Sequence, residues 1–407
     1  MDFALDDKTK ALAEVAKRFL HEEVIPAEPQ HAADLRDAEN PWRRTPTARR
    51  LAARARELGL WNLFLPGEDG AGLTQLQYAT IAEISGWSPN LMPQAMNCAA
   101  PDSGNMEMLR DFASPEAKDR WLKPLLDGEI RSAFCMTEPA VASSDARNIQ
   151  ASMIRDGDEY LINGRKWFTS GAMNPESEIF IVMGKSDPTG EPHRQQSMIL
   201  VPRDTPGVTI LRPLTVFGYL DHDHGGHAEV DFVDVRVPVT NILKGEGEGF
   251  AISQARLGPG RIHHCMRLLG MAERALDLVG HRAWERSAFG KPLAKQGTVR
   301  EFVANARITI ESLRLLTLKT AWLMDTVGNR AAHTEIQAIK IAVPREVQAI
   351  IDDAIQLFGG AGLSQDTPLA ELFAAARGLR LADGPDAAHI ASLGRNELRR
   401  FEPSEAV

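Results

Sequence analysis

Cysteine is scarce in this chain of 407 residues: Cys98, Cys135 and Cys265 stand far apart, with no Cys-x-x-Cys or Cys/His spacing. Three such cysteines predict neither a disulfide framework nor a zinc site. Long apolar runs are also missing, since none approaches the roughly 18 residues that a membrane-spanning helix needs. We therefore expect a protein without a membrane span, in a reducing cytoplasm.

Positive charge is not in excess. The formal net charge is −9, which argues against nucleic acid as the main partner. The first residues alternate charged and apolar side chains at helical spacing and include acids, unlike a signal or transit peptide. With 43% hydrophobic and 25% charged residues, the composition is that of a folded chain large enough for two or three domains.

The hydrophobic period changes twice along the chain. Residues 1–130 favour helices, because apolar positions recur every three or four residues, and Ser114 before Pro115 is typical of a helix start. Residues 131–243 have a period of two, in short β-prone runs separated by turn pairs such as Asp156-Gly157. The helical period returns over residues 244–407. This pattern predicts an α+β protein with an N-terminal α-helical domain, a middle β-domain and a C-terminal α-helical domain.

Two motifs in the β-domain indicate a ligand cradle. Residues 134–145 read FCMTEPAVASSD, and residues 164–171 read GRKWFTSG. Each ends a β-prone run in small residues and hydroxyls, so that backbone N–H groups and side chains such as Thr137 can bond a planar, oxygen-rich ring system. From the residues alone, the first motif can equally be a strand end with a Glu138-Pro139 turn, and Trp167 a core aromatic.

Three further motifs stand in a fixed order after these two: RSAFGKPL at 286–293, QLFGGAG at 356–362 and LADGPD at 381–386. The set resembles the acyl-CoA dehydrogenase family over nearly the whole chain. The strings LGPGRIHHCMRL and RLADGPD look most like the dehydrogenase domain of animal proteins that fuse a kinase-like domain to it; the sequence shows no such kinase-like segment. The resemblance implies that family's fold, with a β-barrel-like middle domain and a C-terminal four-helix bundle. It also implies FAD as cofactor, an acyl-CoA substrate and an electron-transfer flavoprotein as partner.

The resemblance also suggests roles for single residues. Trp167 would pack on the flavin, Thr169 would bond near its N5 atom, and Arg286 would pair with the pyrophosphate, although an arginine there can also be a surface charge that complements a helix dipole. The arginine and the Gly359-Gly360 pair would lie across a subunit interface, which implies a homodimer or homotetramer. The implied cofactor-binding residues are Phe134, Met136, Thr137, Ser143, Trp167, Phe168, Thr169, Arg286, Phe289, Gln296, Gln356, Gly359, Gly360 and Pro385. The implied substrate-binding residues are Ser144, Gly258, Arg261 and Gly384, with Ser144 preferred to Ser143 because it directly precedes Asp145.

Asp383 decides the mechanism. Most of the family has Glu in a Tyr-Glu-Gly-Thr string here, whereas this chain has Ala-Asp-Gly-Pro, and residues 258–261 offer no other carboxylate. The resemblance makes Asp383 the base that removes the α-proton of an acyl-CoA while a hydride leaves Cβ, giving a trans-2-enoyl-CoA. The resemblance to the fusion-protein branch suggests substrates of the 4-hydroxyacyl-CoA type. Taken alone, Asp before Gly-Pro indicates a helix cap. Two alternatives are a flavin oxidase or monooxygenase on the same fold and a non-catalytic acyl-CoA-binding protein.

Histidines gather in two places. The string DHDHGGH at 221–227 invites a metal site, but a Gly-rich loop with solvated histidines is the favoured interpretation, and we expect no metal. His263 and His264 should face opposite directions around one helix turn. At most one of them can face the pocket, where it could bind a phosphate or hydroxyl of the substrate.

Overall fold

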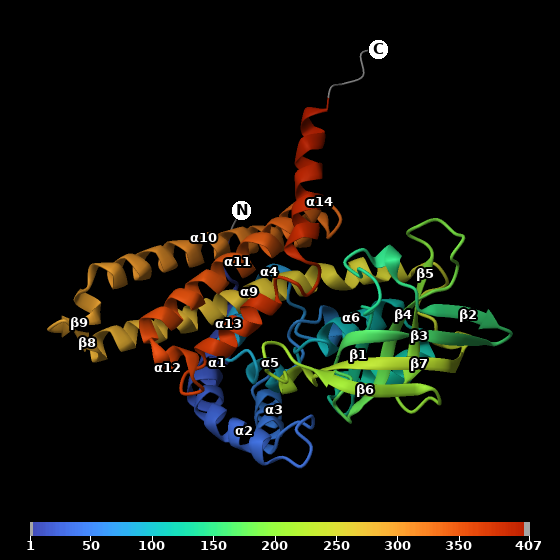
Figure 1. The fold of residues 1–407 in the computed structure, drawn as a ribbon, viewed down its shortest axis with the longest axis horizontal. Coiled ribbons are helices and arrows are strands. Elements are labelled where there is room, and N and C mark those ends of the chain that lie inside the picture. Colours follow the sequence, from blue (N-terminus) through green and yellow to red (C-terminus); the bar gives the residue numbers. More distant parts are fainter. Residues whose placement is uncertain (1–2, 403–407) are drawn as a thin grey trace. The chain divides into compact units, whose positions relative to one another are not determined.

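The computed structural model describes residues 3–402, which form two compact units (Figure 1). The helical unit contains residues 3–20, 73–89 and 258–402, and the sheet unit contains residues 21–72 and 90–257. Helix α9 (Gly249–Glu285) supplies residues to both units. Residues 3–130 therefore contribute to each.

Within the described chain, the sheet unit is built on one seven-stranded sheet with the order β1-β4-β2-β3-β7-β6, in which β5 pairs with β4. β1 pairs with β4 in parallel and also with β3, through Phe134 and Ser170, so that the sheet curls back on itself. This is the barrel-like arrangement that the resemblance implied. The strands are β1 (Arg131–Cys135), β2 (Ser152–Asp156), β3 (Glu159–Ser170), β4 (Ser177–Lys185), β5 (Gln196–Pro202), β6 (Val208–Leu214) and β7 (His227–Pro238).

The core of the sheet unit follows from the alternation of its strands. Tyr160 and Ile162 on β3 and Val235 and Val237 on β7 are buried, while residues between them are more exposed. β4 differs because it is buried almost throughout, as is usual for a strand covered on both faces. Its central position explains the unbroken apolar run around Phe180.

The helices of the sheet unit are short. The sequence signals at Ser114 and Pro115 are confirmed, since the Ser114 hydroxyl accepts the backbone N–H of Ala117 at 3.2 Å and Pro115 is the first helical residue. A π-helical turn (Lys118–Leu122) then leads into the next helix. The helices are α2 (Ile25–Asp37), α3 (Pro46–Glu57), α5 (Met92–Ala95), α6 (Asp102–Phe112), α7 (Pro115–Ala117) and α8 (Lys123–Leu126).

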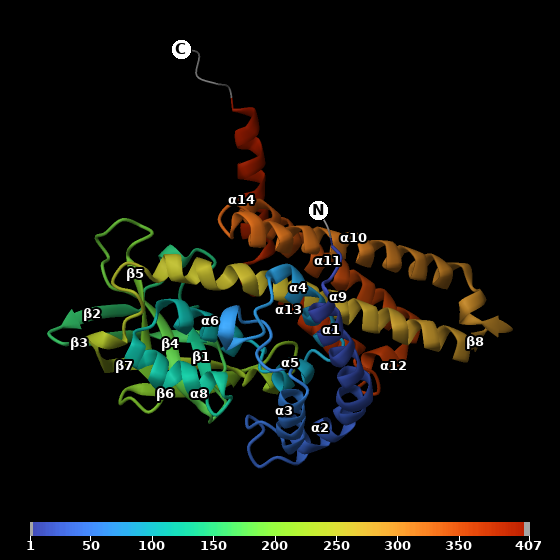
Figure 2. The same ribbon diagram turned by 180° about the vertical axis from the view of Figure 1, so that it is seen from behind.

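The helical unit is a bundle in which α11 lies at the centre. α11 packs against α10, α13 and α14, and α4 packs against α1 and α10 (Figure 2). A hairpin of two short strands joins α9 to α10 at the end of the bundle that is remote from α14. The elements are α1 (Asp7–Phe19), α4 (Gln75–Ser85), α10 (Gly297–Val327), α11 (His333–Phe358), α12 (Gly360–Leu363), α13 (Leu369–Gly378), α14 (Asp386–Leu398), β8 (Ser287–Ala288) and β9 (Lys291–Pro292).

Ion pairs tie three of these helices together. Arg314 on α10 donates to Glu83 on α4 at 2.7 Å and to Glu273 on α9 at 2.5 Å. Two carboxylates on one partly buried guanidinium form a network, which stabilises more than an isolated surface pair. The helix–strand–helix order expected from the sequence is confirmed. No described helix has the length and apolarity to cross a membrane.

Candidate functional site

The two cradle motifs lie side by side in the sheet unit. The backbone N–H of Trp167 donates to the Thr137 carbonyl at 3.0 Å, and the Thr137 hydroxyl donates to the Trp167 carbonyl at 2.7 Å. The fold thus brings the end of β1 against the middle of β3, as the cradle hypothesis requires. Because the Thr137 hydroxyl proton is already donated to Trp167, its oxygen is left to act as an acceptor.

A buried ion pair fastens the same two motifs. Lys166 is fully buried, and its ammonium donates to the Glu138 carboxylate at 2.7 Å and to the Met136 carbonyl at 3.0 Å. The carboxylate also accepts the backbone N–H groups of Gln150 and Ala151 at 2.8 and 2.9 Å. Burial lowers the pKa of Lys166, and Glu138 opposes that effect. Every polar contact of this pair serves to hold the cradle together.

The two candidate serines differ in position. The Ser143 hydroxyl accepts the backbone N–H of Glu138 at 2.9 Å and so closes the loop that follows β1. Ser144 is exposed. Asp145 caps the next turn by accepting the backbone N–H of Arg147 at 3.1 Å. Ser143 therefore shapes the loop, whereas Ser144 is available to a ligand.

The second motif presents its side chains differently from a core strand. Trp167 is only half-buried and does not belong to the hydrophobic core, which argues against the core-aromatic interpretation. Phe168 adopts a left-handed backbone with φ 46° and is 43% exposed. The Thr169 hydroxyl is buried and makes no hydrogen bond to an oxygen or nitrogen of the described residues. A buried hydroxyl without such a partner is costly, so it fits a polar ligand atom at this place.

Arg256 contributes a cation beside the first motif that the sequence did not indicate. Its guanidinium lies 4.1 Å from the ring centroid of Phe134. Gly104 leaves the necessary space, because a Cβ at that position would come within 2.9 Å of the Arg256 Nε. One turn further along α6, burial raises the pKa of Glu107 to about 7, although Arg110 and Arg256 oppose it. The end of β1 thus has the Arg256 guanidinium beside the ring of Phe134.

Asp383 lies in a tight turn of the helical unit, not in a helix cap. Its φ is 57°, and α14 begins at Asp386 with Pro385 at its N-cap position and no capping side chain. The Asp383 carbonyl accepts two bonds from the Arg261 guanidinium, at 3.1 and 3.3 Å. The helix-cap interpretation is therefore wrong, because a contact from α9 and the left-handed turn place the aspartate before the helix starts.

Lys340 on α11 fixes the same turn from another side. It is 1% exposed, and its ammonium donates to the carbonyls of Leu379 at 2.6 Å and Ala382 at 2.9 Å. Burial lowers the pKa of Lys340, and the charge of Asp383 opposes that effect. Gly384 completes the turn with φ 103°, a conformation that a side chain would strain.

His263 and His264 do face opposite ways, as expected. His263 is buried, contacts the ring of Tyr78 edge-on and lies 3.1 Å from the Gln75 side-chain oxygen. Burial holds its pKa far below the usual value, so it is neutral. His264 instead places Nε2 at 3.4 Å from Asp383 Oδ2, and both side chains are partly exposed. One histidine packs the bundle and the other faces the candidate base.

The residues expected to bind the pyrophosphate end of FAD lie near α12 and the β8–β9 hairpin, at the end of this unit that is remote from α14 (Figure 1). Arg286 is exposed, Phe289 at the tip of the β8–β9 hairpin is 99% exposed, and Gln296 donates to the Ala288 carbonyl at 3.1 Å. Gln356 is 16 residues after Lys340 on α11, or about 24 Å along the axis. This separation fits the expectation that these residues complete the site of another subunit.

Two of the proposed substrate-binding residues have packing roles in the helical unit. A Cβ on Gly258 would come within 2.3 Å of the Asn329 side chain, so the glycine permits close packing there. Arg261 is 6% exposed and is used on the Asp383 carbonyl. Its guanidinium therefore holds the turn.

His224 and His227 of the 221–227 loop are paired with a carboxylate, not solvated as expected. Asp221 accepts from His224 at 2.9 Å and from His227 at 2.6 Å, and Asp223 lies 2.9 Å from His31. Across the described chain, no group of three or more His, Cys, Asp or Glu side chains could hold a metal ion. Asp221 thus pairs with two imidazoles and Asp223 with one, and these contacts hold the loop against α2 and β7.

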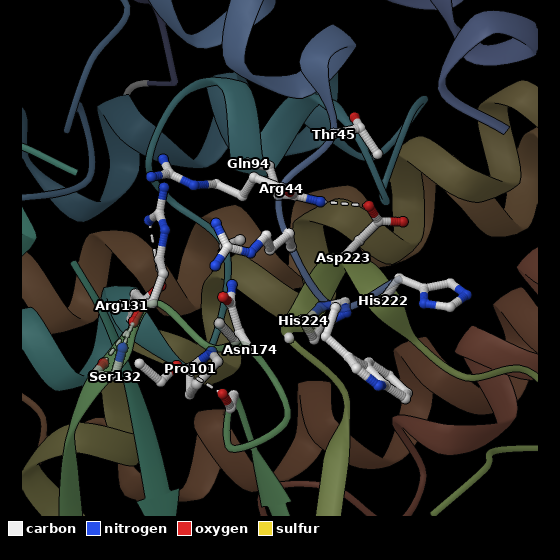
Figure 3. Close-up of a pocket in the computed structure, with 18 of the residues that line it drawn as sticks. Arg44, Thr45, Gln94, Pro101, Arg131, Ser132, Asn174, His222, Asp223 and His224 are labelled. Carbon is white, nitrogen blue, oxygen red and sulfur yellow. Dashed lines mark hydrogen bonds and ion pairs between the residues drawn. The ribbon is translucent and has the colours of Figure 1, made fainter. Parts of the chain in front are cut away.

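A cavity of about 30 Å³ lies beside this loop in the sheet unit. Figure 3 shows Arg131 and Asp223 on its opposite sides. Arg131 is held by Asn97 at 2.7 Å and Asp102 at 3.3 Å, while its Nη2 has no partner among the described residues. The space suits about one or two water molecules, which would satisfy Nη2. It is too small for an acyl chain or a flavin.

With the cradle motifs and the Asp383 turn each described, comparison with known proteins decides the family. The models of the N-terminal, middle and C-terminal domains of acyl-CoA dehydrogenases match residues 6–129, 133–235 and 247–398. The chain belongs to the acyl-CoA dehydrogenase family. It is 53% identical over 409 residues to "Probable acyl-CoA dehydrogenase FadE2" of Mycobacterium tuberculosis, covering 100% of this chain and 99% of that protein.

Other acyl-CoA dehydrogenases extend the comparison. Acyl-CoA dehydrogenase family member 11 of Gallus gallus is 53% identical over 94% of this chain, which spans only 49% of that protein. A solved family structure from Mycobacterium abscessus has a TM-score of 0.95 at 47% identity, covering 98% of this chain and 100% of that one. A glutaryl-CoA dehydrogenase from Mycobacterium smegmatis, solved with FADH2, shares the fold with a TM-score of 0.81 at 21% identity, over 97% and 95% of the two chains.

Sequence reasoning missed three charged residues that shape this acyl-CoA dehydrogenase site. Lys166 follows Tyr160 and Ile162 at even spacing on β3, so the alternation of the strand pointed inward at this lysine. Lys340 stands among Ile336, Val343 and Val347 on the apolar face of α11. For Lys166 and for Lys340, the available signal was a lysine at a position where the pattern of the element calls for a buried apolar residue. Arg256 gave none.

Proposed function

We propose that this chain is an FAD-dependent acyl-CoA dehydrogenase that converts an acyl-CoA thioester to a trans-2-enoyl-CoA, with Asp383 as the base. The observation that carries the proposal is the Asp383 turn: a 17% exposed carboxylate on a left-handed backbone, with its carbonyl held by Arg261. Sparsely populated backbone conformations that neighbouring residues enforce are common at active sites.

FAD is the cofactor that the cradle fits. The buried Thr169 hydroxyl has no oxygen or nitrogen partner among the described residues, and half-buried Trp167 supplies a ring face. Ser144 is exposed for the thioester side. When bound, FAD would accept the hydride that leaves Cβ. A relative with the same fold was solved with FADH2.

The protein's own residues account for the proton transfer. The charges of Lys340 and Arg261 favour the ionised form of the neighbouring Asp383 carboxylate, which must be ionised to accept the α-proton. Aspartate is one methylene shorter than the usual glutamate. The left-handed turn changes the position of the Asp383 backbone. We infer that this change brings the carboxylate closer to the substrate and so compensates for the shorter side chain.

Three finer points belong to the same proposal. The electrons would pass to an electron-transfer flavoprotein. The substrate would be of the 4-hydroxyacyl-CoA type, because the strings at 257–268 and 380–386 resemble that branch. The assembly would be a homodimer or homotetramer, since the exposed Arg286 and the Gly359-Gly360 pair lie near the β8–β9 hairpin and α12, at the end of the unit that is remote from α14.

Anaerobic titration tests the function. The FAD-loaded protein is mixed with straight-chain and 4-oxygenated acyl-CoA thioesters while the flavin absorbance is followed, and bleaching by at least one of them is expected. Asp383→Asn should keep FAD and acyl-CoA affinity but reduce flavin about 10²–10⁴-fold more slowly. Failure of every thioester to bleach the flavin would refute dehydrogenation, and rapid reaction of the reduced flavin with oxygen would indicate an oxidase.

A further inference from the structure

The Asp383 carboxylate has one imidazole beside it and two buried cations behind it. His264 Nε2 lies 3.4 Å from Asp383 Oδ2, and the two side chains are 19% and 17% exposed. Arg261 and Lys340 bind carbonyls of the same turn. Among the described residues, neither cation lies within 4.0 Å of a carboxylate oxygen. The charges of Arg261 and Lys340 both act on Asp383, and that of Lys340 acts on Asp386 as well.

We propose that His264 is a positioning residue for Asp383, holding the carboxylate in one orientation and favouring its ionised form, so that the base works at lower pH. This inference rests on the proposed dehydrogenation. An N–H donor or a positive charge within about 4–6 Å of a carboxylate stabilises the ionised state.

The neighbouring histidine shows that packing does not require this arrangement. His263 fills the bundle interior against Tyr78 and Gln75. His264 is on the opposite side of α9, where its ring is more exposed. Since any medium-sized side chain would cover that surface, the choice of an imidazole facing a carboxylate points to chemistry.

Burial also shifts the pKa of several other titratable groups around the turn, including His333, whose pKa it lowers. Burial raises the pKa of Cys265 to about 12 and lowers that of His389 to about 4. Asp386 is paired with Arg345 at 3.0 Å and with Arg380 at 2.8 Å, and its pKa is lowered. An acid limb in the rate that moves when His264 is replaced would therefore report the coupled Asp383–His264 pair. The groups that face the turn are Arg261 and Cys265 from α9, His333 and Lys340 from α11, Arg380 before it, and Asp386 and His389 from α14.

The test is the pH profile of flavin reduction in the full-length, FAD-loaded protein, measured by stopped flow with a thioester that bleaches the wild type. His264→Leu should move the acid limb up by about one pH unit, while the plateau rate falls less than about tenfold. His264→Gln keeps a donor near the Nε2 position and should move the limb less. His281→Gln is the matched control, because His281 pairs with Asp277 at 3.7 Å on the exposed side of the same helix. Its limb should coincide with that of the wild type.

Two results would overturn the proposal. One is an acid limb of His264→Leu that coincides with the wild type. The other is a raised acyl-CoA dissociation constant without any movement of the limb, which would make His264 a substrate ligand. Flavin content and circular dichroism check that each variant is folded. Asp383→Asn distinguishes the failure of the proposed base from the failure of the His264 proposal. A wild-type rate in that variant refutes Asp383 as base, whatever the His264 variants do.

Discussion

Replacing Glu138 by glutamine should destabilise the sheet unit and weaken FAD together. The substitution preserves shape but leaves the Lys166 ammonium, which is fully buried, without its counter-charge. The amide also replaces one carboxylate oxygen by an NH₂ group. An NH₂ in the place of Oε2 would face the backbone N–H of Gln150. An NH₂ in the place of Oε1 would face the backbone N–H of Ala151 and the Lys166 ammonium. Each way of placing the amide therefore creates at least one donor facing a donor.

The burial of the pair sets the size of the effect. The side chains of Lys166 and Glu138 are 0% and 5% exposed, so water cannot replace the lost charge. Removing one partner of such a pair costs about 3–5 kcal/mol. Because the pair joins the two cradle motifs, part of this loss should also appear as at least a tenfold weaker FAD affinity, equivalent to about 1.4 kcal/mol.

The assay is urea unfolding of the FAD-free protein, followed by circular dichroism, together with FAD titration by flavin fluorescence. Asp156→Asn is the matched control. Asp156 pairs with Arg236 at 2.9 Å in the same sheet, but the side chains are 61% and 47% exposed. Loss of that surface pair should cost less than about 1 kcal/mol. Adding Lys166→Met to Glu138→Gln should recover part of the stability, since the unpaired charge is then gone.

A Glu138→Gln protein that loses no more stability than Asp156→Asn would refute this reasoning. So would a double variant that is less stable than Glu138→Gln alone. If stability falls as expected but FAD affinity is unchanged, the pair supports the sheet without shaping the cradle.

Two other outcomes follow from named groups. Arg286→Ala should lower FAD affinity and oligomer stability in parallel, measured by flavin content and sedimentation, whereas Lys291→Ala in the same exposed hairpin should change neither; a flavin-loaded monomer would contradict the shared site. Glu107→Gln should stabilise the protein at pH 8 by up to about 3 kcal/mol, because burial raises the folded-state pKa to about 7. The folded state then binds an extra proton between about pH 4.5 and 7, so wild-type stability falls as pH rises through that window; urea midpoints at pH 5 and pH 8 that differ equally in both proteins would exclude this effect.

Local sequence was sufficient for the order of the elements and for the two cradle motifs. Strand alternation and turn pairs depend on residues within a few positions of each other, as do helix starts such as Ser114-Pro115. The cradle strings could be found for the same reason, because each is a continuous segment. That they lie together depends on the pairing of β1 with β3, which joins Phe134 to Ser170 across the intervening strand β2.

The conformation at Asp383 shows where local rules end. Asp-Gly-Pro is a good helix start by its own residues, yet the aspartate lies before the helix with φ 57°. Arg261, 122 positions away, and Lys340, 42 positions from Ala382, hold that turn through its carbonyls. No pattern within the segment contains these partners.

The sequence by itself therefore determined the family, the fold class and the identity of the candidate base, all of which are carried by short contiguous strings. Only the tertiary structure decided how that base is held, which histidine faces it, and that Lys166 and Glu138 fasten the cradle. Buried charges need partners, and those partners come from whichever elements the fold packs together. Such pairings are set by three-dimensional proximity, and sequence spacing does not record it.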